Sequence, residues 1–247
     1  MHDIWEWSVM DHTVKKDRIQ IIDGIRGLSI LLMVVHHFLY DLTEVCNAPE
    51  WIFTNPLFDS LHYFFAGLFI LLSGVSSLYS SSNVKRGIKT LACAGIITLV
   101  SWFMGSPVWF GILHLLGTCM LFYGLTHKLW ERIPQALAPV IYIAGIIICI
   151  PLTRGIISSE RYLWMLGWTY EGFLSYDYFP LLPWIFVFLL GTCLGGYIKE
   201  GRMPDRFYTM KVPALANIGR RSLVIYMLHQ PVLYGVIMLA VFISQKL

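Results

Sequence analysis

The sequence predicts an all-α membrane protein, a polytopic bundle of about seven transmembrane helices. Hydrophobic residues make up 57% of the 247 residues, and charged residues make up only 13%. Soluble globular proteins carry about twice that charged fraction. The mean hydropathy is +0.65. Seven apolar stretches are each long enough to cross about 30 Å of hydrocarbon, the core of a typical bilayer.

These stretches follow one another without a soluble insertion, which predicts a single transmembrane domain over residues 1–247. The first is not a cleavable signal peptide, because it follows polar and mixed residues and lacks a small-x-small cleavage site. Residues 1–20 predict a leader at the cytoplasmic membrane interface. Only residues 105–107 separate the third and fourth spans, which predicts a tight hairpin. The predicted spans are 21–42, 56–80, 86–105, 107–126, 136–153, 179–198 and 221–244.

Two connections are longer than the rest. The stretch 154–178 is rich in aromatic and charged residues, and a loop of this length is typical of a lid or an entry site. The stretch 199–221 is basic. Its charge fits either the positive-inside rule with anionic membrane lipids, or a docking surface for an anionic, phosphate-bearing cosubstrate.

The basic residues also predict the orientation. With the N-terminus in the cytoplasm, all of the 18 lysines and arginines except Arg154, Arg161 and Lys246 fall on or near the inner side. This bias requires an odd number of spans and places the C-terminus outside. The expected location is the cell (inner or plasma) membrane, with several passes. The net charge of +3 reflects this topology and does not indicate a nucleic-acid partner.

The five cysteines predict neither a disulfide framework nor a metal site. None belongs to a CxxC pair, and four lie inside apolar spans, where they are typical of small buried hydrophobic residues. Cys46 is alone on the predicted outer side. No metal is therefore predicted.

Four ionisable residues share one face of the first span: Asp23, Arg26, His37 and Asp41, hereafter the polar stripe. Eleven residues at about 100° each bring His37 to within about 20° of Arg26, roughly 16 Å further along the helix. Such groups are costly against lipid. The stripe therefore predicts a cavity or a pathway inside the bundle.

Five histidines fall within the predicted spans. From the rise of about 1.5 Å per residue, His37, His62 and His114 are expected in one layer of the outer half of the bilayer, with His229 deeper. His36 points about 100° away from His37 and is expected to be structural. A histidine in a partly dry pocket suits general acid or base work, and a nearby carboxylate can orient its ring.

Several motifs resemble those of transmembrane acyltransferases. Asp23 and Arg26 belong to an Asp-x-x-Arg-Gly sequence that is followed by an apolar run and His37. This arrangement resembles the first helix of two families, the acyltransferase-3 membrane O-acyltransferases and the heparan-α-glucosaminide N-acetyltransferase catalytic-domain family. The second family, in its compact bacterial members, is favoured by four further stretches at 64–74, 111–117, 177–184 and 219–231.

This resemblance implies transfer of an acetyl group from cytoplasmic acetyl-CoA to a hydroxyl or amine acceptor, a sugar or glycan, at the outer side. A pantetheine arm is about as long as the distance between Arg26 and His37. The expected catalytic residues are His37, Asp41, His62, His114 and Asp177, and the expected residues for binding the cosubstrate are Asp23, Arg26, Arg220, Arg221 and His229.

The chain also departs from the pattern. In the lysosomal sugar acetyltransferase the position of His37 is an asparagine, and the catalytic histidine follows beyond the helix end, whereas residues 44–50 contain no histidine here. Two other functions stay open: a haem- or quinone-binding electron-transfer subunit that uses these histidines, and a small-solute transporter lined by the stripe. The oligomeric state, a homodimer included, also stays open.

Overall fold

The computed structural model describes residues 18–49, 51 and 55–246 and confirms the all-helical fold. Each predicted span coincides with a helix. By length and composition, five of the described helices are able to cross a membrane (α1, α3, α4, α7 and α10), and α6 is a shorter apolar helix. The predicted leader lies mostly in residues 1–17, outside the described residues. The helices are α1 (Gln20–Cys46), α3 (Pro56–Ser77), α4 (Asn83–Phe103), α5 (Ile112–Trp130), α6 (Ala138–Thr153), α7 (Leu181–Lys199) and α10 (Ser222–Ser244).

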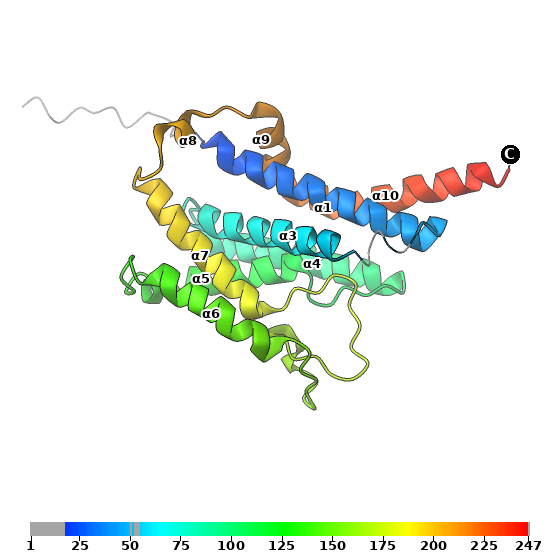
Figure 1. Ribbon diagram of the computed structural model, residues 1–247, viewed down its shortest axis with the longest axis horizontal. Helices are drawn as coiled ribbons and strands as arrows, with labels where there is room; N and C mark the ends of the chain where they lie inside the picture. Colours follow the sequence, from blue (N-terminus) through cyan, green and yellow to red (C-terminus); the bar gives the residue numbers. More distant parts are fainter. Residues whose placement is uncertain (1–17, 50, 52–54, 247) are drawn as a thin grey trace, which may run out of the picture.

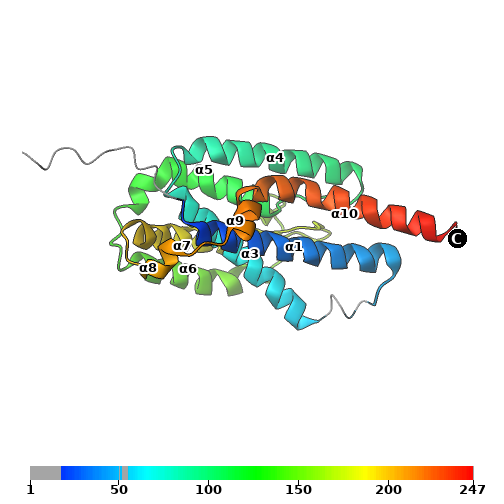
Figure 2. The same cartoon turned by 90° about the horizontal axis from the view of Figure 1, so that it is seen from above.

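The helices pack as neighbouring pairs along the bundle (Figure 1). α4 lies along α5, α3 along α7, and α7 also along α6. α1 contacts both α3 and α10. α1 and α10 run in the same direction, and the end of α10 projects beyond the other helices (Figure 1 and Figure 2). The helix that carries the polar stripe is therefore placed between two partners.

Local sequence fixes several helix ends. The side chain of Asn55 accepts a hydrogen bond from the Leu57 N–H at 2.9 Å, and Pro56 is the first residue of α3. An Asn cap followed by Pro is a favourable helix start. Ser82 caps α4 in the same way. α1 ends at Asn47, whose φ of 52° is the left-handed conformation that stops a helix.

The hairpin between the third and fourth spans is longer than predicted. α5 begins at Ile112 and not at residue 107, so the predicted start was wrong. The intervening residues pair with the outer loop: the Phe179 N–H donates to the Phe110 carbonyl at 2.8 Å, and the Tyr176 N–H donates to the Pro107 carbonyl at 3.2 Å. Hydropathy does not distinguish an apolar loop from the start of a helix.

Both long connections contain helical turns. The outer stretch holds the 3₁₀ helix η1 (Leu163–Leu166), and the inner stretch holds α8 (Asp205–Thr209) and α9 (Pro213–Arg220). α9 packs along the first turns of α1. The basic connection over 199–221 thus contains a helix whose small residues, such as Ala216 and Gly219, are buried.

Glycines allow α9 to approach α1 so closely. A Cβ atom added to Gly219 would overlap the carbonyl oxygen of Asp23, and one added to Gly27 would overlap that of Leu215. Small residues are common where membrane helices pack backbone to backbone. The contact fixes α9 at the level of the Asp23–Gly27 segment.

We expect Gly219→Ala to destabilise the protein by about 1–3 kcal/mol, because the new methyl group must force two backbones apart. Thermal unfolding of the purified protein in detergent measures this loss. Gly235→Ala is the matched control, because nothing lies within 4 Å of a Cβ atom at that position of α10. Equal melting temperatures for the two variants would contradict the close packing of α9 on α1.

Candidate active site

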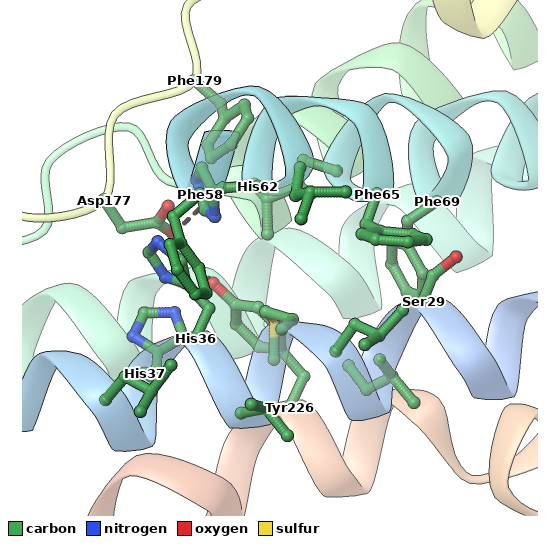
Figure 3. A pocket seen from close by; sticks show the side chains of 18 residues that line it. Ser29, His36, His37, Phe58, His62, Phe65, Phe69, Asp177, Phe179 and Tyr226 are labelled. Atoms are coloured by element: carbon green, nitrogen blue, oxygen red, sulfur yellow. Dashed lines mark hydrogen bonds between the residues drawn. The ribbon is translucent and has the colours of Figure 1, made fainter. Parts of the chain in front are cut away.

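A cavity of about 110 Å³ follows α1 and is lined from Ser29, one turn after Arg26, to Leu39, just beyond His37. Figure 3 shows its two ends. Ser29 lies near Phe65 and Phe69 at one end, and the polar side chains gather at the other. The wall is mostly apolar, and its polar members at the second end are His36, His37, His62, Asp177 and Tyr226.

The inward orientation of this face of α1 agrees with the polar stripe. Ile30 is 1% exposed, whereas its neighbour Leu31, which does not line the cavity, is 37% exposed. Asp23 and Asp41 are each 4% exposed. A carboxylate is rarely buried to this extent unless it has partners inside the protein. The stripe is therefore an interior face, as predicted.

Three helices bring histidine rings together at the polar end. His36 of α1 stacks on His62 of α3, with 4.2 Å between ring centroids. His37 of α1 lies 5.0 Å from His229 of α10. Adjacent residues on a helix point about 100° apart, so the two neighbours face the two different partners of α1. His36, which was expected to be structural, also lines the cavity.

Asp177 closes the cavity from the loop before α7. Its Oδ2 accepts a hydrogen bond from the Tyr226 hydroxyl at 2.8 Å and another from the Ile112 N–H at 3.3 Å. Burial raises the pKa of Asp177, and these hydrogen bonds, together with His62 and His229, offset part of that rise. The carboxyl group thus ties α10 and the start of α5 to the outer loop.

Asp41 and His229 each take part in a contact between α1 and α10. Oδ1 of Asp41 accepts a hydrogen bond from Nε2 of Gln230 at 2.7 Å. Nδ1 of His229 lies 2.7 Å from the carbonyl oxygen of Tyr226. His229 was expected to bind the cosubstrate with the arginines, but the structure groups it with His37. Tyr226, His229 and Gln230 are spaced i, i+3 and i+4, a pattern that identifies one helix face and that sequence reasoning missed.

The other end of the stripe is an arginine cluster. Arg26 forms an ion pair with Asp23 at 3.0 Å and donates hydrogen bonds to the Ser76 hydroxyl and the Leu72 carbonyl near the end of α3. Arg18 pairs with the same aspartate at 2.8 Å. Sequence reasoning missed a third member, Arg86, which donates to the Ser76 carbonyl at 3.2 Å and is only partly buried.

Three of the predicted residues lie away from these groups. Nε2 of His114 lies 3.1 Å from the Thr98 hydroxyl of α4, and its ring stacks on Phe110 outside the cavity lining. It faces α4, which packs along α5. Arg220 and Arg221 are exposed where α9 meets α10, and Arg220 donates to the side chain of Asn217.

Among the residues that the structure describes, no group of three or more His, Cys, Asp or Glu side chains is arranged to hold a metal ion. The five cysteines are free. The site contains paired imidazole rings beside a carboxyl group, an arrangement that suits proton transfer.

Comparison with known proteins gives one result. The family model described as "Heparan-alpha-glucosaminide N-acetyltransferase, catalytic" matches residues 18–231. No curated protein and no solved structure matches the chain significantly. The matched segment includes the whole polar stripe, the cavity and the start of α10 as far as Pro231.

Proposed function

Because the chain belongs to the heparan-alpha-glucosaminide N-acetyltransferase catalytic family, we propose that it transfers the acetyl group of cytoplasmic acetyl-CoA to an acceptor on the outer side of the membrane. Family membership makes the protein an acetyltransferase in a multi-pass membrane fold. The donor, the sugar or glycan acceptor and the direction of transfer are the parts that we propose.

The position of the cavity along α1 is the observation that supports this proposal. Its lining starts one turn after Arg26 and ends beyond His37, so it follows the same path of roughly 16 Å that separates those residues on the helix. The wall is apolar between the two ends, which suits a pantetheine arm. The diphosphate of CoA would meet Arg26 with Arg18 and Arg86, and the thioester would lie beside His37.

The direction of transfer follows from the charges. The inner end of α1 lies at the same end of the molecule as α8 and α9, whose segment is basic (Figure 1). By the positive-inside rule this end faces the cytoplasm. The basic loop, including Arg220 and Arg221, would then attract the anionic cosubstrate or anionic lipid to the membrane surface.

His37 is the proposed general base. It would take the proton of an acceptor hydroxyl or amine as the lone pair of that group attacks the acetyl carbon. The sulfur of CoA leaves with the electron pair of the C–S bond. His62 and Asp177 would hold the acceptor and the loop around it, since both line the cavity at the same end as His37.

Product formation by purified protein tests this function. We expect protein in detergent to bind CoA by calorimetry, and to convert acetyl-CoA and glucosamine, used as a probe amine, into N-acetylglucosamine by mass spectrometry. His37→Asn should bind CoA and form product about 10²–10⁴-fold more slowly. A Soret band in the visible spectrum of the purified protein, with no CoA binding, would favour an electron-transfer subunit instead.

A further inference from the structure

The interface between α1 and α10 contains three buried polar atoms without a partner. Within the part of the chain that the structure describes, Oδ2 of Asp41, Nε2 of His229 and Oε1 of Gln230 have no hydrogen-bond partner. Leaving such an atom unsatisfied costs about 1–3 kcal/mol. All three accept a hydrogen bond in their neutral or anionic form, so this interface can receive hydrogens from a donor group.

The contacts of His229 define which of its ring nitrogens can accept a proton. Its Nδ1 lies 2.7 Å from the Tyr226 carbonyl, which is itself only an acceptor, so Nδ1 carries the hydrogen. Nε2 of the neutral ring therefore keeps its lone pair. The neighbouring ring is that of His37, with 5.0 Å between the centroids. A proton can pass between the two rings once the His37 ring turns one of its N–H groups toward this lone pair.

We propose that His229 is a positioning residue that holds the proton which His37 takes from the acceptor, so that the two imidazoles form a proton relay across the α1–α10 interface. This inference rests on the proposed acetyl transfer. Asp41 lies one turn after His37, and Gln230 follows His229. Their hydrogen bond places a buried carboxyl group next to the relay, and a negative charge there stabilises the imidazolium form.

The relay balances over one turnover. The acceptor X–H forms a C–X bond to the acetyl carbon, and its proton passes to His37 and then to Nε2 of His229. The C–S bond breaks, and its electron pair stays on sulfur. The proton returns through His37 to that sulfur and yields the thiol of CoA. No other reactant is needed, and the protein ends in its starting protonation state.

Other titratable groups surround His37 and His229 on the neighbouring helices and on the loop before α7. Their titration must be followed together with that of the two histidines. A single histidine signal that moves with pH therefore requires assignment by substitution. The groups are His36 and Asp41 on α1, His62 on α3, Asp177 before α7 and Tyr226 on α10.

The first experiment needs no substrate. ¹⁵N-histidine NMR of the purified full chain reports the tautomer and the titration of each ring, assigned with His37→Asn and His229→Asn. We expect His229 to carry its hydrogen on Nδ1, and the titration midpoint of His37 to shift when His229 becomes asparagine. Asparagine keeps a donor for the Tyr226 carbonyl but has no base. An unchanged His37 titration would overturn the relay.

The second experiment measures turnover with acetyl-CoA and glucosamine as the probe. His229→Asn should lower kcat about 10²-fold, leave KM for acetyl-CoA unchanged, and remove one limb of the pH profile. His127→Asn is the matched control, because its Nδ1 also lies near the carbonyl three residues earlier, in this case at 3.2 Å and far from the cavity lining. Wild-type kcat and pH profile in His229→Asn would overturn the relay.

The two experiments separate the relay from the proposed function. If the wild-type protein acetylates no amine, the acetyl-transfer proposal fails. The NMR titration still shows whether protonation of one ring changes the titration of the other. If His229→Asn does not fold, the wild-type titration decides. A relay requires the signals of His37 and His229 to move in two linked steps, and independent titration of the two rings would overturn it.

Discussion

Replacing His37 with asparagine should lower the rate of acetyl transfer by about 10²–10⁴-fold, the usual cost of losing general acid–base catalysis. The ring lines the polar end of the cavity and lies 5.0 Å from His229. Asparagine is polar and smaller, so the variant is expected to fold. The measurement is CoA release with acetyl-CoA and glucosamine, together with CoA affinity by calorimetry.

Two comparisons make this prediction specific. CoA affinity should stay near the wild-type value in His37→Asn, because the phosphate end of the proposed site lies at the opposite end of the stripe. His127→Asn should keep wild-type activity, since His127 contacts only the Gly124 carbonyl in the described contacts. Full activity in His37→Asn would transfer the role of base to His36 or His62, which stack on each other in the same cavity.

Arg26→Gln should destabilise the protein by about 3–5 kcal/mol, the range for breaking a buried ion pair on one side. Asp23 is 4% exposed and would keep only Arg18, whose side chain is 65% exposed, as its charged partner. The hydrogen bonds of Arg26 to Leu72 and Ser76 would be lost as well. Chemical unfolding in detergent measures the loss.

The double variant Asp23→Asn/Arg26→Gln separates the two roles of Arg26. It removes both charges, so most of the stability should return. CoA binding should stay weak, because the charge that meets the phosphates is still absent. Full CoA affinity in the double variant would restrict Arg26 to a structural role and place the phosphate site on other residues, with Arg86 as the first candidate.

Sequence reasoning located the helices because a membrane fold depends on long apolar stretches, and these are visible without tertiary information. The inward face of α1 was also predictable, since Asp23, Arg26, His37 and Asp41 recur on one helical face. The family resemblance that the motifs indicated is confirmed by the match over residues 18–231.

The composition of the site was less predictable, because it depends on which helices become neighbours. His37 and His62 were expected in one layer, and both line the cavity. His114 has a similar calculated depth, but α5 starts later and turns it toward α4. His36 was assigned to a different face, although a helix between two partners has two inward faces.

The role of α9 could not be predicted from charge and hydropathy. Its basic residues indicated a surface loop, whereas the contact with α1 depends on the absence of side chains at Gly27 and Gly219. Arg86 was missed for a related reason. It belongs to the predicted inner group of basic residues, and only the packing of α3 against α1 places Ser76 between Arg26 and Arg86.

Acetyl transfer across a sealed bilayer tests most directly whether α1 connects a cytoplasmic CoA site to an outer acceptor site. Proteoliposomes with enclosed glucosamine receive acetyl-CoA, labelled in the acetyl group, from outside. We predict labelled N-acetylglucosamine inside the vesicles, formed about 10²–10⁴-fold more slowly in vesicles with His37→Asn. Product that forms only when acetyl-CoA and glucosamine are on the same side of the membrane would contradict transmembrane transfer.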